Sequence, residues 1–322
     1  MKRSLDISVV ICSYNRADYI IGALESLWQQ TFDKDRFEVL VVDNNSIDNT
    51  GELVQAYIED HPGFDLKYLT ESRQGASFAR NTGASFSSGA LLCFMDDDAI
   101  AEPEYLQRIA DFFPAHSDAA ALGGRIIPKY IPAEPKWMSH FVSSLVGNFD
   151  YSQELTVFQQ GKYPLESNMI VRKDDFDAIG GFNTALPGVK GTLRVGGEGK
   201  EFFLRLQALG KKVYYDPKAI VHHVVEVKKL TPHYMYRVAS GIGRGERVRT
   251  KAISQGAFIK KILEYLYKLA GSVVLAILYA LKAKPAQSWP VIKFRIDALK
   301  GLLEKGSEGE ESQQFKIENS KT

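Results

Sequence analysis

The stretch Leu91-Leu92-Cys93-Phe94-Met95-Asp96-Asp97-Asp98 decides the fold, because five apolar residues run directly into three consecutive carboxylates. A short apolar run of this kind is typical of a strand that is buried inside a sheet. Three adjacent carboxylates repel one another, and a nearby cation relieves that repulsion. The strand is therefore expected to end at a polar, functional edge of the sheet.

Strands and helices alternate on both sides of this stretch. Further strands are predicted at residues 7–12, 37–42, 66–69, 119–127, 165–172, 213–215 and 219–223, and helices at 18–28, 50–57, 76–84, 103–113 and 198–209. The alternation predicts an α/β fold with a mostly parallel sheet and helices on both of its faces. Ligands of such sheets bind beyond the carboxyl ends of the strands, where Asp96 lies.

Three segments lack a regular pattern. Residues 128–164 contain four prolines and are expected to form a long loop. Residues 183–197 are rich in glycine and are expected to form a mobile loop. The run Gly241-Ile242-Gly243-Arg244-Gly245 follows no clear strand, so it is expected to be a flexible basic turn rather than a phosphate loop.

The composition is that of an ordinary folded protein. The chain has 322 residues, of which 45% are hydrophobic and 25% charged, so it can bury a sizeable core. Its formal net charge is +1, which argues against a nucleic-acid partner. Cys12 and Cys93 lie in apolar runs and form no CxxC pair, so we expect buried thiols in a reducing compartment. Residues 1–6 show no secretory pattern, so a cytoplasmic location is expected.

The three carboxylates suit a hard divalent cation. In an extended segment, Asp96 and Asp98 point to one side while Asp97 points away. Such a pair can hold Mn²⁺ or Mg²⁺ and leave positions open for phosphate oxygens. The alternative is an Asp-rich turn that caps a helix, since Asp is common in turns.

Two histidines, His222 and His223, end the last predicted strand. In an alternating strand only one of them can face the acidic site, and the pattern leaves open which one. His223 is taken as the candidate metal ligand. A pair of structural histidines on an edge strand is the alternative.

Six segments, in their order and spacing over residues 7–223, resemble the family 2 glycosyltransferases, which have the GT-A fold. The segments are SVVICSYNR at 8–16, VDNNSIDNT at 42–50, GASFARNTGA at 75–84, FMDDD at 94–98, NMIVR at 168–172 with GGF at 180–182, and GGE at 196–198. The resemblance implies transfer of a sugar from a nucleoside-diphosphate donor to an acceptor hydroxyl, with the help of a divalent metal.

The resemblance also implies roles for single residues. The residues expected to contact the donor are Ser13, Tyr14, Asn15, Asp43, Arg73, Arg80, Asp96 and Asp97. Tyr14 and Asp43 would contact the nucleobase and ribose, and the two arginines would lie near the diphosphate. Asp96 and Asp98 would form the metal-binding motif, which His223 would complete. The alternatives for the arginines are a surface charge on a helix and a solvated charge in a loop.

The general base is less clear, because the chain departs from the family here. The family usually has Glu-Asp at the start of the late helix, whereas this chain has Glu198 followed by Gly199. Glu198 is the first candidate for the base, and Glu201, one turn further, is the second. The alternative role of Glu198 is to favour the N-terminus of the helix electrostatically. A chain without a base would be a non-catalytic nucleotide-sugar-binding protein.

The expected reaction is a single displacement that inverts the anomeric centre of the sugar. The donor is expected to be UDP-linked, and the acceptor a saccharide or a lipid-linked sugar, in the synthesis of cell-surface polysaccharide or glycolipid. A nicotinamide-dependent dehydrogenase is disfavoured, because it needs GxGxxG after the first strand. A nucleotidyltransferase would want a glycine-rich basic loop at that place, where this chain has residues 13–16, SYNR.

The C-terminal third differs from the rest. Residues 226–261 hold nine Lys or Arg and two Glu, and residues 262–281 are strongly apolar. We expect a catalytic domain at 1–225, a helical extension at 226–305 and a disordered tail at 306–322. The extension either packs on the catalytic domain or contacts a membrane through residues 262–300, which would keep the protein at the inner face of the cell membrane.

Overall fold

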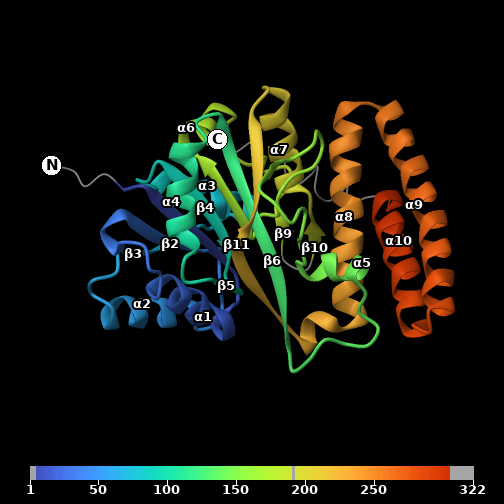
Figure 1. Cartoon of the computed structure of the whole chain (residues 1–322), viewed down its shortest axis with the longest axis horizontal. Helices are drawn as coiled ribbons and strands as arrows, with labels where there is room; N and C mark the ends of the chain where they lie inside the picture. Colours follow the sequence, from blue (N-terminus) through green and yellow to red (C-terminus); the bar gives the residue numbers. More distant parts are fainter. Residues whose placement is uncertain (1–4, 191–192, 305–322) are drawn as a thin grey trace.

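The structure is a computed structural model that describes residues 5–190 and 193–304, so the predicted tail at 306–322 lies outside the described residues. Figure 1 shows a twisted sheet with helices around it and a group of long helices on the right-hand side. This arrangement agrees with the expected α/β fold and its C-terminal helical extension.

One large sheet forms the centre of the protein. Its strands within the described residues are β1 (Ile7–Ser13), β2 (Phe37–Asp43), β3 (Leu66–Thr70), β4 (Leu91–Asp96), β5 (Ala99–Ala101), β6 (Ala119–Ile131), β7 (Thr156–Val157), β8 (Asn168–Arg172) and β11 (Lys212–Glu226). Their order is β3-β2-β1-β4-β8-β6-β11-β5, and β7 pairs with β11. Strands β8, β5 and β7 run opposite to the other six, so the sheet is mostly parallel, as predicted.

The register brings three strand ends to one edge. Ser13 at the end of β1 pairs with Asp43 at the end of β2, and Cys12 pairs with Asp96 at the end of β4. Strands β1 and β2 are almost fully buried, as the apolar runs at these positions predict. The polar side chains after these strands therefore meet where the sheet leaves the core.

Helices cover both faces of the sheet. On one face lie α1 (Ala17–Trp28), α2 (Thr50–Asp60) and α4 (Tyr105–Ala115), and on the other α3 (Ala76–Phe86), α6 (Lys173–Ala178) and α7 (Glu198–Ala208). Leu24 and Leu106 belong to the first core cluster, and Phe202 and Leu206 to the second. Burying each of these side chains contributes about 1.5–3 kcal/mol.

Two predicted segments are more regular than the sequence indicates. Strand β6 continues to Ile131 because it pairs with β11 as far as Glu226, and β11 is one long strand with an irregularity between Asp216 and Ile220. The predicted loop at 183–197 contains a hairpin of β9 (Gly188–Lys190) and β10 (Leu193–Val195). The rest of the predicted loop at 128–164 includes a short helix, α5 (His140–Ser143).

Three long helices form the C-terminal extension. They are α8 (Pro232–Ile253), α9 (Gln255–Leu281) and α10 (Ser288–Leu303), which pack together around a third apolar cluster. The glycine run at 241–245 lies inside α8, so the predicted flexible turn is wrong. A Cβ on Gly245 would lie 1.5 Å from the carbonyl oxygen of Gly196, and one on Gly243 would lie 2.0 Å from that of Ala298. Glycine is needed because α8 packs directly against these two backbones.

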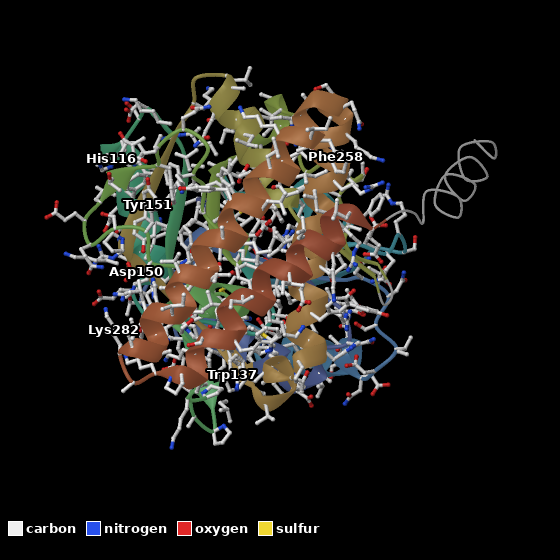
Figure 2. All side chains as sticks on the ribbon, turned by 90° about the vertical axis from the view of Figure 1, so that its right-hand side faces the viewer. His116, Trp137, Asp150, Tyr151, Phe258 and Lys282 are labelled. Carbon is white, nitrogen blue, oxygen red and sulfur yellow. The ribbon has the colours of Figure 1, made fainter. Side chains whose placement is uncertain are left out.

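Helix α9 has an unusual surface. Among the described residues it is the one helix long and apolar enough to cross a membrane by length and composition, with a mean hydropathy of 1.5 and 17% of the apolar window buried. It packs on α8 and α10 along one side only. Figure 2 views this side of the protein, with Phe258 and Lys282 marking the two ends of α9.

Candidate active site

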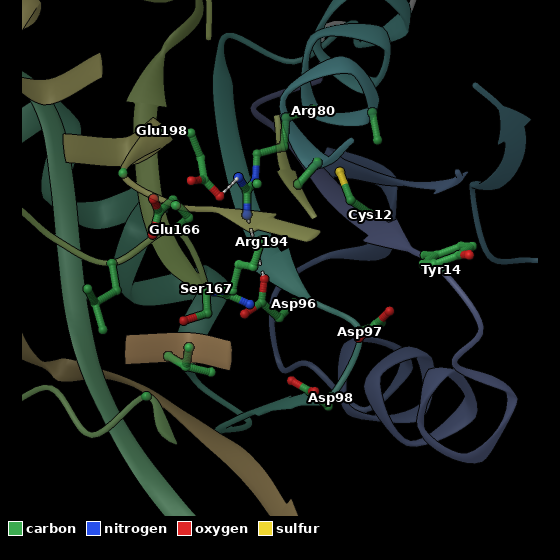
Figure 3. A pocket seen from close by; sticks show the side chains of 18 of the residues that line it. Cys12, Tyr14, Arg80, Asp96, Asp97, Asp98, Glu166, Ser167, Arg194 and Glu198 are labelled. Atoms are coloured by element: carbon green, nitrogen blue, oxygen red, sulfur yellow. Dashed lines mark hydrogen bonds and ion pairs between the residues drawn. The ribbon is translucent and has the colours of Figure 1, made fainter. Parts of the chain in front are cut away.

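A cleft of about 410 Å³ opens beyond the carboxyl ends of β1 and β4. Its walls are built by segments that are far apart in the sequence. They include Cys12, Ser13, Tyr14 and Arg16 at the end of β1, Arg80 on α3, Asp96–Asp98 at the end of β4, Leu165–Ser167 before β8, Gly196–Glu198 at the start of α7, His223 on β11, and Tyr234, Val238, Ile242 and Glu246 on α8. Figure 3 shows Arg80, Glu166 and Glu198 close together, with Asp96 near them and Asp97 and Asp98 further along the same turn.

Asp97 and Asp98 are both buried at the floor of the cleft. Arg16 approaches both, with Nε 3.5 Å from Oδ1 of Asp97 and Nη2 3.9 Å from Oδ2 of Asp98. Burial raises the pKa of Asp97 against the opposing charge of Arg16. Burial alone would also raise the pKa of Asp98, but the positive charges of His223 and Lys229 outweigh it and lower that pKa.

His223 and Lys229 hold the two oxygens of Asp98. Nε2 of His223 lies 2.9 Å from Oδ1 of Asp98, and Nδ1 of His223 lies 2.7 Å from the carbonyl oxygen of Val146. Nζ of Lys229 donates to Oδ2 of Asp98 at 2.5 Å and to the carbonyl of Val224 at 2.7 Å. Lys229 is 1% exposed, so its ammonium is an internal cation of the site.

Asp98 and His223 fit a divalent ion as two protein ligands. Nδ1 of His223 donates to the carbonyl of Val146, so a metal ion bound at Nε2 would take the place of the proton that Nε2 directs at Asp98 in the metal-free protein. Mn²⁺ and Mg²⁺ accept one or two carboxylates together with phosphate oxygens and water. Within residues 5–190 and 193–304 no three His, Cys, Asp or Glu side chains form a complete metal site, so the donor would supply further ligands.

Arg80 lies between two carboxylates on the opposite wall. Its Nη1 is 3.4 Å from Oε1 of Glu198, and its Nη2 is 3.9 Å from Oδ1 of Asp96. Its guanidinium also stacks over the ring of Phe182 at 5.3 Å. Burial raises the pKa of Glu198, and the nearby charge of Glu166 adds to this effect, against the charge of Arg80.

Several predicted residues line the cleft, and others do not. Ser13, Tyr14, Arg80, Asp96, Asp97, Asp98, Glu198 and His223 line it. Asp43 lies at the same edge outside the cleft, where it accepts hydrogen bonds from the hydroxyl of Tyr68 and the amide of Ser46. Asn15 joins the loops after β1 and β2, because its Oδ1 accepts from the amide of Ile47.

Three further candidates are held by other partners. Arg73 forms an ion pair with Glu71 at 2.7 Å. Glu201 is paired with Arg205 on α7, which places it on the helix away from the cleft. Nε2 of His222 lies 2.6 Å from Oε1 of Glu102, so of the two histidines His223 is the one that faces the site.

Sequence reasoning missed Glu166, Arg194 and Lys229, which all line the cleft or hold its carboxylates. Glu166 precedes β8, and β8 is antiparallel to β4 and β6. Because β8 runs opposite to β4 and β6, the residues just before β8 lie at the same edge of the sheet as the residues just after β4 and β6. Predicting that β8 is antiparallel to its neighbours would therefore have placed Glu166 at the site.

An α/β sheet with an acidic cleft beyond its parallel strands is the layout expected of a GT-A glycosyltransferase. The sequence pattern of the family described as glycosyl transferase family 2 matches residues 8–180. The chain therefore belongs to glycosyl transferase family 2, which confirms the resemblance in its sequence.

Characterised relatives and solved structures agree with this assignment. The chain is 26% identical over 226 residues to the glucosyl-dolichyl phosphate glucuronosyltransferase of Haloferax volcanii, covering 68% of this chain and 69% of that protein. It is 27% identical over 255 residues to the succinoglycan biosynthesis protein ExoM of Rhizobium meliloti, covering 77% of each. The mannosyltransferase PcManGT from Pyrobaculum calidifontis, in complex with GDP-Man and Mn²⁺, superposes with a TM-score of 0.64 at 20% identity, over 95% of this chain and 89% of that one. This last likeness shows the fold.

Proposed function

We propose that this glycosyltransferase moves a sugar from a nucleoside-diphosphate donor, UDP-linked in our first choice, to a hydroxyl of a saccharide or lipid-linked acceptor. The observation that carries the proposal is that Asp98, His223 and Arg80 meet in one cleft. A cation and a diphosphate need groups of opposite charge, and the cleft offers both within reach of one ligand.

In the proposed reaction, the acceptor oxygen bonds to the anomeric carbon as the bond from that carbon to the diphosphate breaks. The diphosphate leaves with the bonding electrons, and a carboxylate of the cleft takes the hydroxyl proton. One displacement of this kind inverts the anomeric centre. Arg80 is suited to bind the diphosphate, because its planar fork is buried and held in place by Glu198.

Asp98 and His223 would hold the metal ion, and a bound Mn²⁺ or Mg²⁺ would neutralise charge on the departing diphosphate. Lys229 neutralises the same carboxylate from the protein side. The side chain of Asp98 is therefore expected to stay ionised at neutral pH, because the positive groups around it lower its pKa.

The surface of α9 supports a location at a membrane. One face of this helix carries a row of exposed apolar residues, which we name the α9 stripe: Ile259, Leu263, Leu266, Val273, Val274, Ile277, Leu278 and Leu281. The residues are spaced as one side of a helix requires. Between residues 254 and 287 the only acidic residue is Glu264, which is paired with Lys261 and Lys268.

Exposed Lys260, Lys282 and Lys284 leave a net positive charge around the α9 stripe. The apolar side chains of the α9 stripe would be buried among the lipid acyl chains, and the anionic head groups would attract the lysines. We therefore propose that α9 lies in the surface of the cytoplasmic face of the cell membrane. The names of the two relatives, one specifying a dolichyl phosphate and one succinoglycan synthesis, support a lipid-linked or polysaccharide acceptor.

A donor screen tests the transfer reaction. Thermal unfolding is measured with UDP-glucose, UDP-N-acetylglucosamine, UDP-glucuronate or GDP-mannose, each with and without Mn²⁺. A donor at about 100 times its dissociation constant is expected to stabilise the protein by about 2.7 kcal/mol. The donor that raises the melting temperature is then tested for release of its nucleoside diphosphate. In Asp98→Asn, Mn²⁺ should no longer increase the stabilisation.

Two outcomes would change the proposal. Stabilisation without release, in the presence of water and of simple sugar acceptors, would favour the alternative of a non-catalytic nucleotide-sugar-binding protein. No stabilisation by any of the donors, with or without Mn²⁺, would contradict the donor site itself.

A further inference from the structure

The carboxylates of the cleft differ in their partners. Six line the cleft in the part of the chain that the structure describes, and five of them have a cationic partner within 4.0 Å. The five pairs are Asp96 with Arg80, Asp97 with Arg16, Asp98 with Lys229, Glu198 with Arg80, and Glu246 with Lys200. Glu166 is the sixth, and no Lys, Arg or His among the described residues forms an ion pair with it. A carboxylate without a cationic partner is the better proton acceptor, because an adjacent positive charge stabilises its ionised form.

Glu166 is held instead by the first turn of α7. Its Oε1 accepts a hydrogen bond from the backbone N–H of Gly199 at 2.7 Å. A Cβ on Gly199 would lie 2.3 Å from this same oxygen and 2.5 Å from Cδ of Glu166. The carboxyl group of Glu166 therefore fills the space that a side chain at position 199 would occupy. The first turn of a helix favours a carboxylate there, because its amide groups are unpaired and its dipole is positive.

The sheet explains how Glu166 reaches this place. Asn168 begins β8 and pairs with Met95, the residue before Asp96, so the residues just before β8 lie at the acidic edge. Figure 3 shows Glu166 beside Glu198 on the wall of the cleft, with Arg80 and Asp96 nearby. Oε1 is engaged by Gly199, whereas Oε2 has no hydrogen-bond partner within the described residues. One oxygen is thus fixed and the other is left for a ligand.

We propose that Glu166 is the general base of the transfer, at the place where α7 has no side chain because residue 199 is glycine. The inference rests on the proposed glycosyl transfer by the same cleft. Oε2 of Glu166 takes the proton of the acceptor hydroxyl, or of water during donor hydrolysis, and Glu166 becomes a neutral carboxylic acid. The acceptor oxygen bonds to the anomeric carbon, and the diphosphate leaves with the electrons of the broken bond.

Glu198 then has a different task. Its Oε1 is engaged by Arg80, and the charge of Glu166 helps burial to raise its pKa. The carboxylate of Glu198 is thus occupied by the guanidinium of Arg80, whereas Oε2 of Glu166 is left for the acceptor. Glu198 is a positioning residue for Arg80, and its loss should weaken donor binding rather than the proton transfer.

Donor hydrolysis separates the two roles. The nucleotide sugar that most stabilises the wild type is incubated with Mn²⁺ and water as the acceptor, and release of nucleoside diphosphate is followed. Glu166→Gln keeps an oxygen for the amide of Gly199, so the fold is expected to survive, as checked by thermal unfolding. Its kcat should fall by about 10²–10⁴-fold while the dissociation constant of the donor stays within about threefold. Glu198→Gln should raise that dissociation constant, and the exposed control Glu154→Gln should match the wild type.

A double variant tests whether a carboxylate at this position in the cleft is sufficient, whichever residue carries it. In Glu166→Ala the space above position 199 is empty, so Gly199→Asp added to it would put a carboxylate into the same region. The double variant should release diphosphate at least about tenfold faster than Glu166→Ala alone. In the wild-type background, Gly199→Asp should lower kcat, because its Cβ would displace the carboxylate of Glu166.

The results distinguish the two proposals. A wild type that hydrolyses its donor and a Glu166→Gln variant that is equally fast would overturn the base assignment and leave glycosyl transfer standing. A wild type that releases no diphosphate from any donor would overturn both together. A double variant no faster than Glu166→Ala would also count against the assigned place of the base.

Discussion

Nζ of Lys229 lies 2.5 Å from Oδ2 of Asp98, although 131 residues separate them in the sequence. The pair joins the acidic turn after β4 to the short 3₁₀ helix η3 (Val227–Leu230) that follows β11. Both side chains are buried, so each charged group has lost its hydration and is stabilised by the other. An ion pair of this kind fixes the position of Asp98 before any metal or donor arrives.

Removing the ammonium of Lys229 should destabilise the protein. Lys229→Met leaves the buried Asp98 with His223 and the more distant Arg16, and breaking a buried pair typically costs about 3–5 kcal/mol. Mn²⁺ should restore part of the loss, because it supplies positive charge at the same carboxylate. Urea unfolding with and without MnCl₂ measures both effects. The exposed neighbour provides the control, since Lys228→Met should cost about 1 kcal/mol or less. A Lys229→Met protein as stable as the wild type would refute the role of the pair.

The ion pair of Glu71 should make stability depend on pH in the acid range. The hydrogen bond from Arg73 lowers the pKa of Glu71 from 4.5 to about 2. Its contribution is therefore fully present above pH 4.5 and is lost as the pH falls through about 2. Glu71→Gln should destabilise the protein by about 1–2 kcal/mol at pH 7, because Arg73 is largely exposed.

The difference in free energy of unfolding between wild type and Glu71→Gln should shrink as the pH is lowered from 4.5 towards 2. Denaturant titrations at several pH values measure it. A difference that stays constant over this range, or grows, would show that the pair does not titrate as its geometry indicates.

Both cysteines should be unreactive in the folded protein. Burial raises the pKa of Cys12 and of Cys93 to about 12. At pH 8 only about one thiol in ten thousand would then be ionised, and the thiolate is the reactive form. Ellman's reagent should react with neither thiol in native buffer and with both in guanidinium chloride. Cys12 is partly exposed and lines the cleft, so fast reaction of its thiol in native buffer, identified by mass spectrometry, would contradict the raised pKa.

The α9 stripe should bind anionic membranes. Leu263→Asp with Ile277→Asp places two charges on the exposed side of α9 and leaves its packed side intact. The full chain should cosediment with vesicles of phosphatidylglycerol and phosphatidylcholine, less at high salt, and the double variant should lose this binding. Phe86→Asp with Leu209→Asp, which adds two carboxylates at exposed apolar positions outside α9, is the matched control. Self-association of the wild type in solution, abolished by the double variant and accompanied by no vesicle binding, would assign the stripe to a second copy instead.

Strands β1, β2 and β4 could be predicted from the sequence because they are buried on both faces. A strand such as β2, in which every residue is buried, reads as an apolar run, and the polar residue after it marks its end. The predicted ends of β1, β2 and β4 lie within one residue of the observed ones. These strand ends alone place Ser13, Asp43 and Asp96 at one edge of the sheet.

Glu166 and Lys229 could not be found in this way. The place of Glu166 depends on the direction of β8, which is set by pairing with β4 and β6 rather than by its local pattern. Lys229 lies in a basic stretch where solvated lysines are the ordinary expectation, and only the distant Asp98 makes its burial favourable. The glycines of α8 favour a turn locally, but packing against neighbouring backbones outweighs that preference.

The contacts of the α8 glycines also limit how this chain can evolve. Inserting one residue before Gly241 would rotate the following part of α8 by about 100° and point side chains at the carbonyl oxygens of Gly196 and Ala298. Gly271 of α9, by contrast, has no neighbouring atom within 4 Å of the place of a Cβ, so α9 is under no such backbone restriction there. The length of the chain between Glu226 and Gly245 must therefore stay the same for α8 to keep its packing.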